Sequence, residues 1–170
     1  LPMIYPLHTL PPRLPLASGA LTLPMALTLP MPSLFRWPNS SGARTPCVRT
    51  STALAVLDDA DRDGVADGPA KILVSGICVA KAINDRGTDH STNGIRMGID
   101  GWLYIAVGDF GAGLLRDNDG AIGLGDKKRV TLYGGGVMRV RPDGTELENY
   151  TVMTRNICDV AISPTLDLFS

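Results

Sequence analysis

The chain has 170 residues, the length of one modest domain, and its formal net charge is −1 at pH 7. A charge balance so near zero gives no support for nucleic-acid binding. The three cysteines, Cys47, Cys78 and Cys158, form no C-x-x-C pair, which argues against a zinc site, a c-type haem or a disulfide scaffold. We expect Cys78 and Cys158 to be small buried hydrophobic residues.

The first fifty residues differ in composition from the rest. They hold ten of the thirteen prolines and no acidic residue, whereas all seventeen acidic residues follow residue 50. Four prolines interrupt the uncharged run 14–35, so it does not predict a membrane span, and no basic region precedes an apolar core as in a signal peptide. We expect residues 1–50 to be a Pro-rich, disordered lead or sequence outside the native reading frame, and residues 51–170 to be the structured domain.

After residue 50, short apolar runs alternate with turns, and no apolar period of 3.6 residues persists for three turns, so the sequence predicts an all-β fold. The expected strands cover residues 53–57, 71–77, 95–99 and 102–108, with hairpins in 136–151 and 159–169. Asp100-Gly101 and Pro142-Asp143-Gly144 predict tight turns, and Pro164 is expected in the turn of the last hairpin.

Hairpins that recur at this spacing along the sequence are typical of β-propeller blades, in which four strands take about 40 to 50 residues. The domain therefore supplies about two to three blades of a partial propeller. Because it also ends within an expected strand, in "SPTLDLFS", we expect the chain to be a fragment. A β-sandwich is the alternative architecture, since short strands with regular turns also suit it.

Ionisable residues flank one expected hairpin in the sequence. His90 precedes the run 95–99, and Asp109 follows the run 102–108. Because a hairpin returns the chain to the edge that it left, both side chains should lie on one rim. An imidazole held by a carboxylate has a fixed tautomer and raised basicity, as a general base needs. The alternative is a surface histidine beside an unrelated turn aspartate.

A second constellation is the acidic turn of residues 59–67. Asp59, Asp61, Asp63 and Asp67 resemble the front half of a calcium loop, although Ala70 stands where a bidentate glutamate would be expected. Calcium binding and a plain exposed turn both remain open. The glycine run 134–136 precedes a strand and has no Lys-Ser/Thr partner, so a bend at the strand entry is favoured over a phosphate cradle.

Three motifs in order carry a family resemblance. They are "DHSTNGIRMGIDGWLYIAVGDFG", "GGGVMRVRPDGTELENYT" and "TRNICDVAISP", within residues 53–170. Together they resemble the soluble glucose/sorbosone dehydrogenases, six-bladed propellers that use pyrroloquinoline quinone (PQQ). They are more similar still to sorbosone-dehydrogenase-like proteins of environmental bacteria. The resemblance implies a PQQ-dependent oxidoreductase that acts on a sugar or other alcohol in the periplasm or outside the cell.

The resemblance also implies roles for four residues. His90 matches the base that takes the substrate hydroxyl proton as hydride passes to the quinone, and Asp109 matches the carboxylate that orients it. Arg155 and Asn156 match a pair that contacts PQQ, with the arginine near the carbonyl that gains negative charge. Ile157 stands where the family has proline, so the backbone at this contact can differ.

In the family, the basic residues that bind the quinone carboxylates and the activating calcium site come from later blades. We therefore expect the 170 residues alone to be inactive. The electron acceptor is not indicated. A noncatalytic propeller that binds a carbohydrate or a protein on the same rim is the alternative function.

Overall fold

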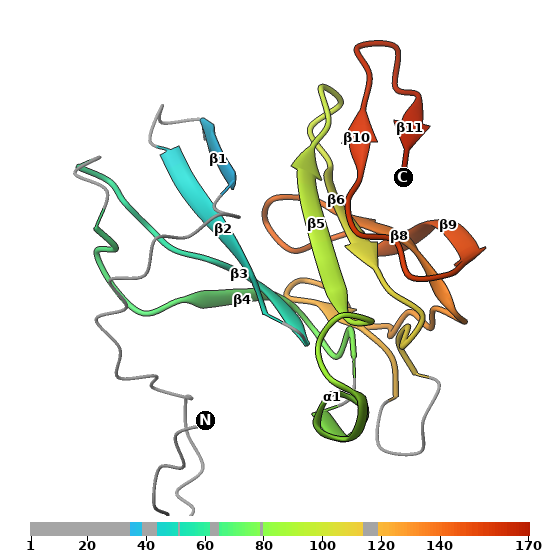
Figure 1. Cartoon of the computed structure of the whole chain (residues 1–170). Coiled ribbons are helices and arrows are strands. Elements are labelled where there is room, and N and C mark those ends of the chain that lie inside the picture. Colours follow the sequence, from blue (N-terminus) through green and yellow to red (C-terminus); the bar gives the residue numbers. More distant parts are fainter. Residues whose placement is uncertain (1–34, 39–43, 51, 62–64, 79, 114–118) are drawn as a thin grey trace, which may run out of the picture.

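The computed structural model describes residues 35–38, 44–50, 52–61, 65–78, 80–113 and 119–170. Its strands are β1 (Phe35–Pro38), β2 (Arg44–Thr50), β3 (Ala53–Val56), β4 (Lys71–Ser75), β5 (Thr92–Met97), β6 (Leu103–Val107), β7 (Ile122–Gly123), β8 (Gly135–Val140), β9 (Glu148–Thr154), β10 (Ala161–Ile162) and β11 (Leu168–Phe169). One short helix, α1 (Ala80–Arg86), joins β4 to β5. The all-β prediction is confirmed (Figure 1).

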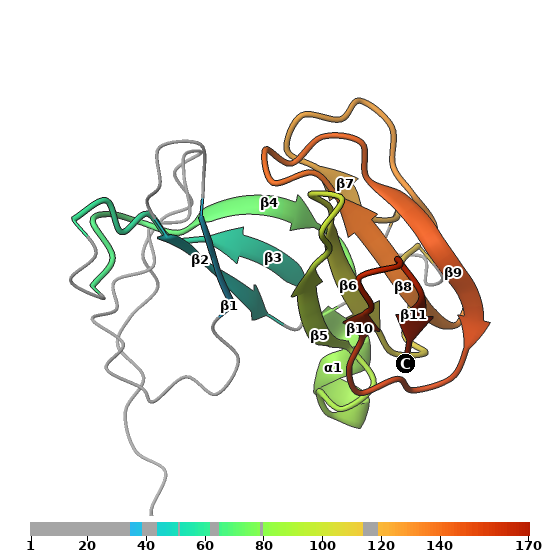
Figure 2. The ribbon, with the colours of Figure 1, turned by 90° about the horizontal axis from the view of Figure 1, so that it is seen from above.

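Three antiparallel sheets make up the described fold. Their strand orders are β1-β2-β3-β4-β7, β5-β6-β8-β9 and β10-β11. Seen from above, β2, β3 and β4 lie to the left of β5, β6, β8 and β9, and the β10–β11 hairpin overlaps β6 and β8 (Figure 2). Among the described residues no sheet closes on itself.

The two central strands of the β5-β6-β8-β9 sheet, which we call the middle sheet, are β6 and β8, and these strands are buried on both faces. Along β6, Leu103, Ile105 and Val107 join a core shared with β3 and β4, whereas Tyr104 and Ala106 pack on the other side, against residues next to and within β10 and β11. A sheet in a two-layer sandwich exposes its outer face, but neighbouring propeller blades cover each other's faces. The layering therefore favours a propeller over a sandwich, and the number of blades stays a prediction.

The predicted turns are present. Gly101 donates its amide to the Gly98 carbonyl at 3.0 Å and Gly144 donates to the Arg141 carbonyl at 2.8 Å, each closing a tight turn. Pro164 lies in the β10–β11 turn, which the Leu166 amide closes on the Ser163 carbonyl at 3.0 Å. At the glycine run, Gly134 has φ +69° immediately before β8, as expected for a bend at a strand entry.

Several elements differ from the expectation. β1 and β2 lie in the Pro-rich lead, where no structure was expected, and β2 pairs with β3 from Cys47↔Val56 to Thr50↔Ala53. Pro38 suits β1, because β1 is a sheet edge and does not need every backbone N–H, whereas Pro46 lies in β2, which pairs with both β1 and β3. Residues 1–34 lie outside the described residues. The domain boundary at residue 50 stays a prediction.

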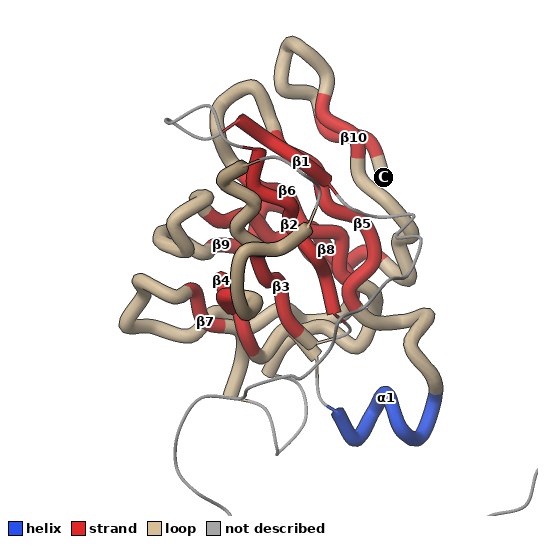
Figure 3. The backbone as a smooth tube through the Cα atoms, turned by 90° about the vertical axis from the view of Figure 1, so that its left-hand side faces the viewer, coloured by secondary structure: helices blue, strands red, loops and turns tan. Residues whose placement is uncertain are grey.

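Helix α1 was also missed, because seven residues make only two turns and give no sustained period (Figure 3). It buries Ala82 beside Cys78 and Phe110. Burial raises the pKa of the Cys78 thiol to about 12, as expected for a core cysteine. Cys158 is exposed, which corrects the expectation that it is buried, because its neighbours Ile157 and Val160 pack into the core in its place. In the described part of the chain, α1 is far too short to cross a membrane, and no other helix could do so.

We expect Ile105→Ala to destabilise the fold by about 2–5 kcal/mol, because the Ile105 side chain is fully buried and its loss leaves a cavity. Ile99→Ala, in the turn of the same hairpin, is the matched control, since Ile99 is 74% exposed. Its effect should stay within about 0.5 kcal/mol. Urea denaturation would measure both, and equal effects would contradict the assigned core.

Candidate functional site

The β5–β6 hairpin brings His90 and Asp109 together as predicted. The ladder continues past the strand ends, because Gly108 donates its amide to the Ser91 carbonyl at 2.7 Å and Phe110 donates to the His90 carbonyl at 3.2 Å. These bonds place both side chains at one end of the hairpin. There the His90 Nδ1 hydrogen-bonds with Asp109 Oδ1. The expected contact is therefore confirmed, while its catalytic role stays a prediction.

The electrostatics of this dyad favour an ionised carboxylate. Burial raises the pKa of Asp109, but the hydrogen bond and charge of His90 outweigh it, with help from the charge of Arg155, and hold the pKa below its ordinary value of 3.8. When the imidazole is neutral, an ionised Asp109 favours the tautomer that donates from Nδ1–H, and the lone pair is then on Nε2. That nitrogen lies 3.6 Å from an oxygen of Asp89, whose side chain is 72% exposed.

The imidazole is also held by its flat face. The rings of His90 and Phe110 stack with centroids 5.4 Å apart and an interplanar angle of 27°. The guanidinium carbon of Arg86, from helix α1, lies 5.0 Å from the Phe110 ring centroid. The carboxylate and the stacked ring together restrict the imidazole to one orientation. The sequence analysis identified neither Phe110 nor Arg86, and only the aromatic residue inside "GDFG" could have hinted at them.

The "TRN" turn joins the dyad. Asn93 of β5 donates its side-chain amide to the Ile157 carbonyl at 2.6 Å, and to Asn156 Oδ1 at 3.4 Å. A Cβ placed on Gly108 would lie 2.7 Å from Asn156 Oδ1 and would collide with the His90 carbonyl. Arg155 is near enough for its charge to act on Asp109. The structure thus gathers all four residues that the resemblance singled out.

The acidic turn is not brought to this site, and hydrogen bonds of Asp67 close it. The Ala60 amide donates to Asp67 Oδ2 at 2.6 Å, and the Asp67 amide donates to the Asp58 carbonyl at 2.8 Å, so Asp67 closes the turn. Asp59 is buried, Asp61 is exposed, and Asp63 lies outside the described residues. The described residues contain no group of three or more His, Cys, Asp or Glu able to hold a metal ion. Calcium binding stays a prediction.

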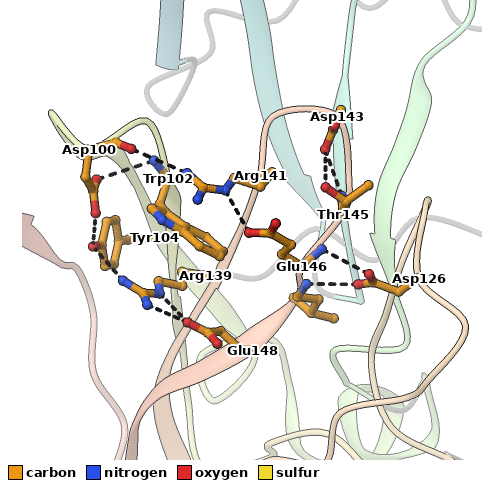
Figure 4. Close-up of polar contacts among 11 residues, drawn as sticks. Asp100, Trp102, Tyr104, Asp126, Arg139, Arg141, Asp143, Thr145, Glu146 and Glu148 are labelled. Carbon is orange, nitrogen blue, oxygen red and sulfur yellow. Dashed lines mark hydrogen bonds and ion pairs between the residues drawn. The ribbon is translucent and has the colours of Figure 1, made fainter.

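The other end of the hairpin carries a cluster that the sequence did not reveal (Figure 4). Trp102 packs against two guanidinium groups, with the Arg139 carbon 4.3 Å and the Arg141 carbon 3.9 Å from its ring centroid. Tyr104 donates its hydroxyl to Asp100 Oδ2 at 2.8 Å, and Arg139 pairs with Glu148 at 2.5 Å. The alternation of arginine with apolar residues from β8 onward was visible, but their aromatic partner just before β6 was not.

Residues 43–169, about three quarters of the chain, match a family described as a domain of unknown function, DUF7133. The chain belongs to this family. The comparisons with curated proteins and with solved structures gave no match. The DUF7133 match starts within the expected lead, just before β2, and includes both the His90–Asp109 dyad and the "TRN" turn.

We expect Gly108→Ala to destabilise this DUF7133 domain by about 1–3 kcal/mol, because the added methyl group would meet the His90 backbone and the Asn156 side chain. Gly68→Ala is the matched control, since nothing lies within 4 Å of a Cβ at that exposed glycine. Its effect should stay within about 0.5 kcal/mol. Thermal unfolding followed by circular dichroism would compare the two, and a Gly108→Ala protein as stable as Gly68→Ala would contradict the close approach.

Asp109→Asn should remove an acid-dependent part of the stability. A carboxyl whose pKa is lowered by folding stabilises the native state above its ordinary pKa of 3.8, and this contribution is lost as the pH falls through the lower folded-state pKa. The difference in free energy of unfolding between the two proteins should therefore be constant near pH 6 and shrink below about pH 4. Urea titrations across this range would measure it, and parallel curves down to pH 2 would contradict a lowered pKa.

Proposed function

We propose that this chain is part of a PQQ-dependent, propeller-type dehydrogenase that oxidises a sugar or another alcohol, with His90 as the general base. The hydrogen bond between His90 Nδ1 and Asp109 carries the proposal. It supports a base because the carboxylate keeps the proton on Nδ1 and leaves Nε2 able to accept one. The reaction class comes from the resemblance of residues 89–111, 134–151 and 154–164 to glucose/sorbosone dehydrogenases.

The chemistry of the neighbouring groups suits the cofactor. PQQ is a planar, anionic quinone, and the site offers a guanidinium from Arg155 and a side-chain amide from Asn156 beside the dyad. In the proposal these two residues bind and orient the quinone, which when bound would supply the hydride acceptor. Residue 157 is isoleucine where the family has proline. This difference does not keep the turn of residues 155–157 away from the dyad, since Asn93 holds the Ile157 carbonyl.

The remaining steps belong to the chain's own residues. His90 Nε2 takes the proton of the substrate hydroxyl, and Asp109 stabilises the imidazolium that forms. Phe110 keeps the ring from turning while the proton moves. The exposed Asp89 can move away from Nε2 when the substrate binds, because it lies beyond hydrogen-bond length at 3.6 Å.

The proposal also includes a periplasmic or extracellular location and further blades that complete the propeller. Those blades would hold the quinone carboxylates and the activating calcium ion. A noncatalytic propeller that binds a carbohydrate or protein on the same rim is the competing function. PQQ-dependent reduction of an artificial dye on addition of aldoses would separate the two.

His90→Ala should lower the turnover number by about 10²–10⁴-fold in a protein that carries the whole propeller, because it removes the general base. PQQ binding, measured by fluorescence quenching, should stay largely unchanged. Asp109→Asn should have a smaller effect, since it keeps the packing and loses the charge, whereas Arg155→Ala should weaken both PQQ binding and turnover.

Asp143→Asn is the matched control for Asp109→Asn. Asp143 is also hydrogen-bonded, to Thr145 at 2.7 Å, but it lies in the exposed β8–β9 turn. Turnover in this control should equal that of the unaltered protein. An unchanged turnover in His90→Ala would overturn the assigned base, and a complete propeller that binds aldoses without oxidising them would favour the noncatalytic function.

A further inference from the structure

We infer that Asn93 is a positioning residue, whose side-chain amide holds the turn of residues 155–157 against the His90–Asp109 dyad. The physical role of Asn93 is independent of any reaction. Its consequence for catalysis rests on the proposed function, because that function makes the turn a cofactor contact.

The backbone of β5 aims Asn93 at the turn. The pairing of β5 with β6 is interrupted between Thr92 and Ile95, so Asn93 lies in a bulge. A bulge re-aims a side chain out of the regular alternation, and such irregularities are frequent beside active sites. Here the Asn93 amide points at residues 155–159, which we call the crossing segment, and reaches both the Ile157 carbonyl and Asn156 Oδ1.

Side chains of β5 hold this crossing segment at two points. Asn93 binds it near the dyad, and Arg96 pairs with Asp159 at 2.5 Å three residues further along β5. The ion pair is exposed, with about half of each side chain in contact with solvent, so it contributes little. The Asn93 bond is partly buried and ends on a backbone carbonyl. It is therefore the stronger link between the turn and β5.

Asn93 holds Asn156 as well as the backbone. The oxygen of the Asn156 side chain lies against Gly108, one residue before Asp109. The preceding residue, Arg155, acts on the charge of Asp109. Loss of the Asn93 amide would free the turn to move away from Gly108, and the positive charge of Arg155 would move with it.

The pKa of the Asp109 carboxyl would change with this displacement even when no cofactor is bound. Its pKa is set by its partial burial, by His90 and by Arg155. Of the other charged groups nearby, Asp89 lies beside the far nitrogen of His90, and Arg86 lies over Phe110. Neither of these is attached to the crossing segment. The segment also carries Asp159, which pairs with Arg96 and does not act on the pKa of Asp109, so a change that follows loss of Asn93 can be assigned to Arg155.

The test uses carbon-13 NMR titration of the Asp109 carboxyl in the 170-residue chain. In Asn93→Ser we expect the pKa of Asp109 to rise toward its ordinary value, and the backbone amide signals of residues 155–157 to shift. Asn93→Gln keeps an amide on a longer side chain and should lie between the two proteins. If Asn93→Ser does not fold, Asn93→Gln replaces it in the test. An Asp109 titration in Asn93→Gln equal to that of the unaltered chain would then overturn the inference.

Asn149→Ser is the matched control. Asn149 donates its side-chain amide to the Thr131 carbonyl at 2.8 Å, a bond of the same kind on β9, and it has no contact with the crossing segment among the described residues. This variant should leave the Asp109 titration unchanged. Equal Asp109 titrations in Asn93→Ser, Asn149→Ser and the unaltered chain would overturn the positioning role.

A second measurement separates this inference from the proposed function. In a protein with the whole propeller, Asn93→Ser should weaken PQQ binding by up to about tenfold, the effect of one lost hydrogen bond. A PQQ affinity equal to that of the unaltered protein would overturn the catalytic consequence of the inference. If the unaltered protein neither binds PQQ nor oxidises aldoses, the proposed function fails, and the NMR titration still decides the role of Asn93.

Discussion

The close packing of three backbone segments around Gly108 is the constraint on which the candidate site depends. A side chain at this position would collide with the His90 carbonyl and press on the Asn156 amide. Because glycine has no Cβ, the end of β6 can lie directly against the start of β5 and against the turn after β9. Residues 90, 109 and 156 therefore meet within one small volume, although they come from three separate places in the sequence.

The rest of the fold keeps this meeting point rigid. Every residue of β6 is buried, because one face of the middle sheet packs on β3 and β4 and the other on the β10–β11 region. The two ends of the β5–β6 hairpin are then fixed by different chemistry. Arginine packed on Trp102 and the Tyr104–Asp100 hydrogen bond hold the turn end, and the His90–Asp109 pair holds the open end. A rigid scaffold that carries polar groups on its rim is the usual arrangement of a functional site.

Local patterns predicted the local part of this structure. Alternating residues and "DG" turns indicated the hairpins, and hairpin geometry alone placed His90 beside Asp109. Features without a local signal were missed, such as the two-turn helix α1, the two-residue strand β7 that pairs with β4, and the proline-containing strands before residue 50. Asn93 and Ile157 are 64 residues apart in the sequence, and no pattern in either segment points to the other. The resemblance identified Arg155 and Asn156, but only the fold shows what holds them beside the dyad.

The arrangement of the dyad bears on the choice between catalysis and simple binding. A rim that only binds a sugar or a protein needs exposed donors and acceptors, and a histidine there gains little from a carboxylate on its inner nitrogen. Asp109 is three-quarters buried, faces Nδ1 and is kept ionised by its neighbours, at the cost of desolvating its charge. The hydrogen bond and charge of His90 offset that cost, and the same hydrogen bond fixes the orientation of the imidazole. An imidazole held in this way, with Nε2 left to accept a proton, is the arrangement that the proposed general base requires.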